Sequence, residues 1–161
     1  VVAASEKASR NVQKELEFPI IARKYEDHTL NEQKLLEESK EVEEFAEGTT
    51  YKEDVIIFEE YEEGDKYRLL YVGGDIISLK DESEGWRISD DSLKYSNASK
   101  TIREEVEKAV NCIGTPYAEI LVRGEQIIDV NPNPDPQIFT DISGKNAYES
   151  LEEVLRGDEE E

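Results

Sequence analysis

Two glycine-containing turns between apolar runs place the strongest constraint on the fold of this chain. The turns are Gly73-Gly74 and Arg123-Gly124. Glycine readily adopts the positive φ angles of tight hairpin turns, so each turn predicts a β-hairpin. A hairpin pairs its strands antiparallel, so the fold must contain antiparallel sheet. The predicted strands are Tyr67–Val72, Asp75–Leu79, Ala118–Val122 and Gln126–Val130.

Four further stretches carry apolar residues at helical spacing. Serine at the start of a helix can accept a hydrogen bond from a free backbone amide, and glycine favours its end. Helices are therefore predicted to begin at Ser5, Ser39 and Ser99, the second and third to end at Gly48 and Gly114, and a last one to cover Asn146–Arg156.

The remaining segments are predicted to be short strands and loops. The strands are Val1–Ala4, Phe18–Arg23, Leu35–Leu36 and Val55–Phe58, and the loops are Tyr25–Lys34, Asp81–Ser96 and the segment around Pro132, Pro134 and Pro136. This order predicts an α+β fold of two lobes with mostly antiparallel sheets. The predicted domains are residues 1–63, residues 64–157 and an acidic tail of residues 158–161.

The composition excludes several classes of function. The chain has 40 acidic and 19 basic residues, a net charge of −21, which disfavours nucleic-acid binding. Such a surface either serves solubility or reflects adaptation to high salt. The sequence contains neither a signal peptide nor an apolar run long enough to cross a membrane, so we expect a cytoplasmic or virion-associated protein that is not secreted. Cys112, the single cysteine, is predicted to be a small core residue.

The start of the chain suggests that part of a longer protein is missing. The sequence contains no methionine, even at its first position, and Val1-Val2 already has the character of a strand. The chain is therefore expected to be a fragment or a processed product.

The second hairpin carries the clearest constellation of polar residues. Asp129 and Asn131 alternate along one strand and therefore point to the same face. Glu119 lies on the partner strand, and hairpin geometry can bring it near them. Two carboxylates and an amide oxygen suit Mg²⁺, or Mn²⁺ in its place, which also takes water and phosphate ligands. These three residues are the predicted metal ligands.

The run Asp129-Val130-Asn131-Pro132-Asn133-Pro134 resembles a motif of the ATP-grasp superfamily, in its RimK-like and glutathione-synthetase-like branch. The resemblance covers the central and C-terminal lobes of that family and implies that Asp129 and Asn131 bind magnesium. Glu119 stands where the family has a further acidic ligand.

The resemblance also implies a set of nucleotide contacts. The strand ending at Arg23, with Lys24 beside it, is similar to the family's phosphate-binding strand. The segment Ile56–Tyr61 resembles the hinge that holds adenine through its backbone, which implies contacts from the Glu60 carbonyl and the Glu62 amide and includes Tyr61. The ribose is expected at Glu63 or Asp65. Phosphate or acyl-phosphate contacts and catalysis are assigned to Arg68 and Arg87, with Trp86 and Asn97 in the same region.

The implied function is an ATP-dependent carboxylate–amine ligase, acting on a peptide or amino acid through an acyl phosphate. Its partners would be a nucleotide and unidentified carboxylate and amine substrates. The family's glycine-rich loop corresponds to Tyr25–Lys34, which has no glycine and includes His28, and the family's N-terminal domain is not part of this sequence. These departures leave a second reading open, a degenerate ATP-grasp domain that serves as a non-catalytic binding or structural module in a viral or other assembly.

Overall fold

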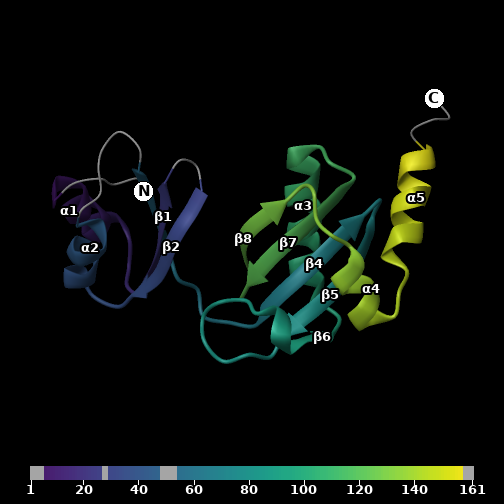
Figure 1. The fold of residues 1–161 in the computed structure, drawn as a ribbon, viewed down its shortest axis with the longest axis horizontal. Coiled ribbons are helices and arrows are strands. Elements are labelled where there is room, and N and C mark those ends of the chain that lie inside the picture. The colour runs from purple at the N-terminus through teal and green to yellow at the C-terminus, as the bar shows by residue number, and fades with distance from the viewer. Residues whose placement is uncertain (1–5, 27–28, 48–53, 158–161) are drawn as a thin grey trace. The chain divides into compact units, whose positions relative to one another are not determined.

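The structure is a computed structural model that describes residues 6–26, 29–47 and 54–157 (Figure 1). Contacts divide the chain into two compact units, Val1–Tyr61 and Glu62–Glu161. Each unit has its own sheet, and every strand pairing among the described residues is antiparallel. The α+β class with antiparallel sheets is therefore confirmed.

The first unit is a three-stranded sheet with helices on one face. Its elements are α1 (Glu6–Glu15), β1 (Ile20–Glu26), β2 (Thr29–Leu36), α2 (Ser39–Ala46) and β3 (Asp54–Glu60), and its strand order is β2-β1-β3. Both helices pack on the same face of the sheet. The core they form contains Val12, Ile20, Ala22, Leu36, Val42, Phe45, Ile56 and Phe58.

The prediction of a loop over Tyr25–Lys34 is wrong. β1 extends to Glu26 and β2 begins at Thr29, and these two residues pair across the hairpin. The polar composition of β2 hid the strand, because most of its side chains face solvent at the edge of the sheet. The predicted strand over residues 1–4, the cap Ser5, His28 and the stop Gly48 lie outside the described residues.

The second unit contains a five-stranded sheet of order β6-β5-β4-β7-β8. Both predicted hairpins are present, with Val72 paired to Asp75 in the first and Arg123 paired to Gln126 in the second. The elements are β4 (Lys66–Val72), β5 (Asp75–Asp81), the 3-10 turn η1 (Asp90–Ser92), β6 (Leu93–Tyr95), α3 (Lys100–Ile113), β7 (Tyr117–Arg123), β8 (Gln126–Asn131), α4 (Gln137–Ser143) and α5 (Ala147–Gly157).

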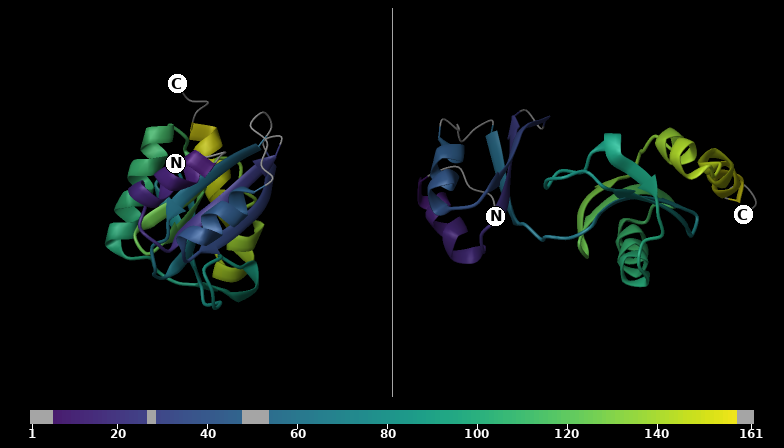
Figure 2. Two further views of the ribbon diagram at one scale, coloured as in Figure 1. Left: turned by 90° about the vertical axis from the view of Figure 1, so that its left-hand side faces the viewer. Right: turned by 90° about the horizontal axis from the view of Figure 1, so that it is seen from below.

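The two faces of this sheet are covered differently. Alternation along the strands sends Leu69 and Ile120 toward α3 and sends Leu70 and Leu79 toward α4 and α5. Figure 2 shows α3 on one side of the sheet and α4 and α5 on the other. The helices α4 and α5 cover only part of their face, and the polar residues of β4, β7 and β8 occupy the same face.

The helices of the second unit confirm one prediction and correct another. Ser99 caps α3 by accepting a hydrogen bond from the Ile102 amide, as predicted. Cys112 is exposed rather than in the core, because the buried stripe of α3 runs through Ile102, Val106 and Val110. None of the helices in the described ranges is long and apolar enough to cross a membrane.

The structure contains three short elements that the sequence pattern did not predict. The predicted loop over Asp81–Ser96 contains the end of β5, η1 and the edge strand β6. The prolines after Asn131 are followed at once by α4, whose Phe139 is fully buried.

In the first unit, the residue that caps α2 is Glu38 rather than Ser39, and the Glu41 carboxylate accepts hydrogen bonds from the amides of Glu37 and Glu38.

Candidate functional site

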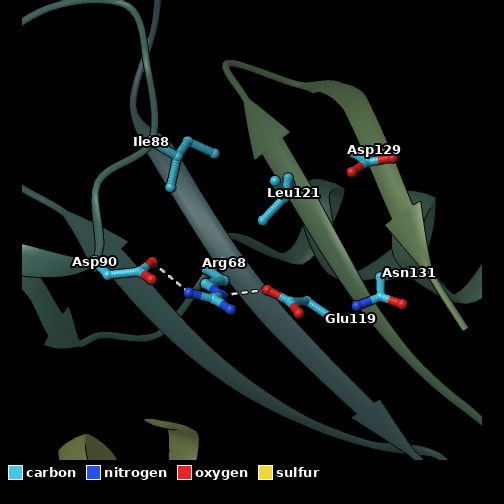
Figure 3. Close-up of a pocket in the computed structure, with 7 residues that line it drawn as sticks. All are labelled: Arg68, Ile88, Asp90, Glu119, Leu121, Asp129 and Asn131. Carbon is cyan, nitrogen blue, oxygen red and sulfur yellow. Dashed lines mark hydrogen bonds and ion pairs between the residues drawn. The ribbon is translucent and has the colours of Figure 1, made fainter. Parts of the chain in front are cut away.

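A cavity of about 310 Å³ opens on the face of the second sheet that α4 and α5 leave uncovered (Figure 3). It lies entirely within the second unit. Four of its lining residues are predicted site residues, namely the three metal ligands and Arg68. The other three were not predicted. The lining residues are Arg68, Ile88, Asp90, Glu119, Leu121, Asp129 and Asn131.

Strand register explains why the predicted ligands meet. Glu119 on β7 pairs directly with Asn131 on β8, and Leu121 pairs with Asp129. Directly paired residues in an antiparallel sheet point to the same face, so all four side chains share one face. Arg68 on β4 pairs with Leu121 from the other side, so its side chain lies on the same face. Asp129 and Asn131 therefore share a face, as the alternation of side chains along the strand predicted.

The remaining wall of the cavity comes from the segment between β5 and β6. This segment contributes Ile88 and Asp90, which stand across from Glu119 and Leu121 (Figure 3). Both residues were missed because this stretch has no strand or helix period. The adjacent acids Asp90-Asp91, which follow Trp86-Arg87 after two intervening residues, are the local signal that could have identified Asp90.

Arg68 is the positive centre of the cavity. Its guanidinium forms ion pairs with Glu119 through Nε and with Asp90 through Nη1. Its carbon Cζ lies 5.8 Å from the centre of the Phe139 ring of α4. Burial would lower the pKa of Arg68, but the hydrogen bond and charge of Glu119, with those of Asp90, outweigh it and raise the pKa. Arg68 therefore remains charged at every working pH.

The donor set fits a hard divalent cation. Glu119, Asp129 and Asn131 line one cavity, and carboxylate and amide oxygens are ligand types that such a cation prefers. Asp129 Oδ1 accepts from the Val130 amide and Asn131 Oδ1 from the Asn133 amide, each at 3.0 Å, which fixes both side chains. The carboxylates of Glu119 and Asp129 each have a second oxygen that can bind a cation. Among the described residues, no three His, Cys, Asp or Glu side chains lie together so that they could hold a metal ion.

The other catalytic candidate, Arg87, does not line this cavity. Its guanidinium lies over the neighbouring Trp86 ring, 5.0 Å from the centre, and its carbonyl accepts a hydrogen bond from Lys66. Asp65, a ribose candidate, forms an ion pair with Lys80 at 2.8 Å. Glu62 accepts from the Glu125 amide, and Glu63 is exposed.

The nucleotide candidates of the first unit lie on β1 and on β3 and the residue after it. Arg23 forms an ion pair with Glu59 at 2.8 Å on the face away from the helices. Lys24 points to the opposite face, as consecutive strand residues must, and pairs with Glu26 at 3.7 Å. The side chain of Glu60 accepts from the Glu17 amide, and the Tyr61 amide donates to the Pro19 carbonyl. Arg23 and Lys24 therefore face opposite sides of the sheet.

Solved structures of ATP-grasp ligases share this fold. The ligase PsnB, complexed with a phosphomimetic variant of its minimal precursor, Mg and ADP, matches 98% of this chain and 52% of its own, at 15% identity and a TM-score of 0.70. A RiPP-associated ATP-grasp ligase of Chryseobacterium gregarium, with ADP and a leader and core peptide, matches 98% and 54%, at 16% identity and a TM-score of 0.67. The ATP complex of D-alanine–D-alanine ligase from Bacillus anthracis matches 100% and 60%, at 14% identity and a TM-score of 0.63.

Comparison of the sequence itself gives no relative. No protein-family model matches it, and no curated protein matches it in sequence. The chain spans a little over half the length of the solved structures it resembles. The structural match shows that the chain has the ATP-grasp fold.

Proposed function

We propose that this chain is the metal-binding and nucleotide-binding part of an ATP-dependent ligase that joins a carboxylate to an amine through an acyl phosphate. The observation that carries the proposal is the cavity that joins Arg68 to Glu119, Asp129 and Asn131. The proposal is supported by the ATP-grasp fold, and by the solved ATP-grasp ligases that contain Mg with ADP, or ATP.

The charges of the cavity indicate why a cation would be needed. Three carboxylate residues, Asp90, Glu119 and Asp129, line the cavity together with one guanidinium residue, Arg68. Phosphate oxygens entering such a cavity would be repelled unless further positive charge accompanied them. A divalent cation held by Glu119, Asp129 and Asn131 would neutralise the phosphates and polarise the phosphoryl group.

The protein's own contribution would be positioning and charge. The paired strands β7 and β8 place the three proposed ligand residues on one face of the sheet, and Arg68 on the same face has a guanidinium suited to phosphate or acyl-phosphate oxygens. Arg23 and the backbone of Glu60 and Glu62 are the proposed nucleotide contacts, with Tyr61, Lys24, Glu63 and Asp65 as further candidates and Arg87 as a second catalytic arginine. The carboxylate and amine are expected to belong to a peptide or amino acid.

One observation favours the non-catalytic alternative. Only positions 27 and 28 separate β1 from β2, and the surrounding strand residues contain no glycine. The glycine-rich loop that the family resemblance implies over the phosphates would thus have little chain to form from. Under this alternative the domain would retain the fold as a binding or structural module.

Calorimetric titration with Mg-ATP tests the proposal. We expect saturable binding to the wild-type chain, and binding at least about tenfold weaker for the double variant Asp129→Ala/Asn131→Ala, as is usual when a metal site loses ligands or their supports. A matched variant, Glu152→Ala on α5 with Asn146→Ala directly before that helix, removes the same two group types from an exposed surface and should bind normally. No binding at millimolar Mg-ATP would contradict the ligase and favour the structural module.

A further inference from the structure

Three charged residues form a buried row at one end of the second sheet. Lys66 on β4 pairs in register with Asp81 on β5 and with Arg123 on β7. All three are nearly inaccessible, with relative exposures of 6%, 3% and 1%. The row lies on the face that carries Arg68, two residues from Lys66 along β4. Charged side chains are rarely buried so completely unless they bind specific partners.

The buried row binds mainly the backbone of residues 82–89, the segment between β5 and η1 that leads to the cavity. This segment is called the anchored segment below. The Lys66 ammonium lies 2.9 Å from Asp81 Oδ2, and it donates to the carbonyls of Ser83, Gly85 and Arg87 at 2.9, 3.1 and 2.9 Å. It also contacts the Ser83 hydroxyl at 2.9 Å. One ammonium therefore collects three carbonyls from five consecutive residues, which bends the segment around it.

Asp81 and Arg123 complete the anchoring. The Asp81 carboxylate accepts hydrogen bonds from the Ser83 amide and hydroxyl, both at 2.8 Å, and from the Ser89 amide at 2.9 Å. Arg123 Nη1 donates to the Trp86 carbonyl at 3.1 Å. The segment is thus held at both of its ends and in its middle by side chains from three strands.

The anchored segment reaches the cavity immediately beyond its last contact. Ser89, held by Asp81, lies between Ile88 and Asp90, which both line the cavity. Asp90 then forms the ion pair with Arg68. A change in the position of Ser89 would therefore move a cavity wall and one of the two carboxylates that orient Arg68.

We propose that Lys66, through its buried pair with Asp81, is a positioning residue that places Ile88 and Asp90 against the binding cavity. A buried ion pair is not required for stability as such, since apolar replacements of both partners often serve as well. What apolar residues cannot supply is a donor for three converging carbonyls. This inference rests on the proposed function where it concerns ligand affinity, but the placement of the segment can be measured independently.

The test uses two variants and one intrinsic probe. Lys66→Met removes the ammonium and leaves Asp81 buried and unpaired, so it risks unfolding the chain. Lys66→Met/Asp81→Leu removes both charges of the pair and is expected to remain folded, because neither charge is left buried without the other. Trp86, the single tryptophan, lies inside the anchored segment and reports its position through acrylamide quenching. Lys108→Met, on the exposed side of α3, is the control for the same substitution outside the row.

The double variant separates positioning from stability. We expect it to remain folded, with Trp86 quenched roughly twofold more strongly and with Mg-ADP bound about tenfold more weakly, the usual loss when a residue that orients a binding group is removed. Unchanged quenching and unchanged Mg-ADP affinity in a folded double variant would overturn the inference. If the wild-type chain bound no Mg-ADP, the proposed function would fail, and the quenching of Trp86 would still decide whether Lys66 positions the segment.

Discussion

Arg68 forms ion pairs with two carboxylates of the cavity that come from different parts of the chain. One is Glu119, a proposed metal ligand, and the other is Asp90, which directly follows the anchored segment. The side chain of Glu119 is 7% exposed, while that of Asp90 is 67% exposed. An ion pair with a buried partner is screened less by solvent, so the contact with Glu119 is the stronger constraint on Arg68.

This arrangement predicts opposite effects of Arg68→Met on two ligands. A cation at Glu119 would compete with the guanidinium for the same carboxylate, so Mn²⁺ alone should bind about two- to tenfold more tightly to the variant. Mg-ADP should bind about tenfold or more weakly, because a charge-assisted hydrogen bond to a phosphate is worth roughly 1.5–3 kcal/mol. Both affinities can be measured by calorimetry.

The control for this prediction is Arg156→Met. Arg156 is an exposed residue of α5 whose ion pair is with Glu152, so its loss should leave both affinities unchanged. Weaker binding of Mn²⁺ to Arg68→Met, or unaltered binding of Mg-ADP, would contradict the role assigned to Arg68.

At the scale of secondary structure, the sequence predicted the elements whose signals are local. Gly73 and Gly74 adopt the positive φ angles expected of their turn, and Gly124 adopts one in the second hairpin, where it is the first turn residue rather than the second. Ser99 and the left-handed Gly114 bound α3 as predicted. The alternation in β8 sufficed to place Asp129 and Asn131 on one face. These features depend on a few neighbouring residues, so the pattern alone determines them.

The elements that were missed depend on distant contacts. β2 is mostly polar and is a strand because it pairs with β1. α4 is short and is held by the burial of Phe139 against the sheet. The cavity wall at Ile88 and Asp90 follows from anchors on β4 and β7, which are far away in sequence, and from Asp81 at the end of β5. No periodicity within residues 82–89 could have indicated these anchors.

The anchored segment should respond to acid through Asp81. Burial would raise the pKa of Asp81, but hydrogen bonds from Ser83, Ser89 and Lys66 outweigh it and lower the pKa. A carboxyl group whose pKa is lower in the folded state stabilises the fold above its unfolded pKa of about 4, and this contribution disappears as the pH falls through the folded value. The Asp81 contribution is therefore complete near neutral pH and lost in acid.

Urea unfolding of the wild type and Asp81→Asn, followed by circular dichroism between pH 7 and pH 2.5, checks this prediction. At pH 7 the variant should be less stable by about 3 kcal/mol or more, the usual cost of breaking one partner from a buried pair. The difference should shrink as the pH drops below about 4. A difference that stays constant over the whole range would show that the charge of Asp81 does not stabilise the segment.

At the scale of the whole molecule, the large negative charge affects how any metal-binding measurement is interpreted. The 40 acidic residues give a net charge of −21, and such a surface attracts divalent cations at many places. Binding of a metal to the chain is therefore weak support for a metal site. The proposed function is more specific. It holds that one place on this acidic surface, the cavity on the second sheet, binds the cation together with a nucleotide.

The most direct test of this claim is residue-specific. A substoichiometric amount of Mn²⁺, added with ADP, broadens the NMR signals of amides near the bound ion. We predict broadening centred on Glu119, Asp129 and Asn131, extending to Asp90, and its loss at these positions in Asp129→Ala/Asn131→Ala. Broadening spread over the acidic residues of α5, with the amides of the cavity unaffected, would contradict the account.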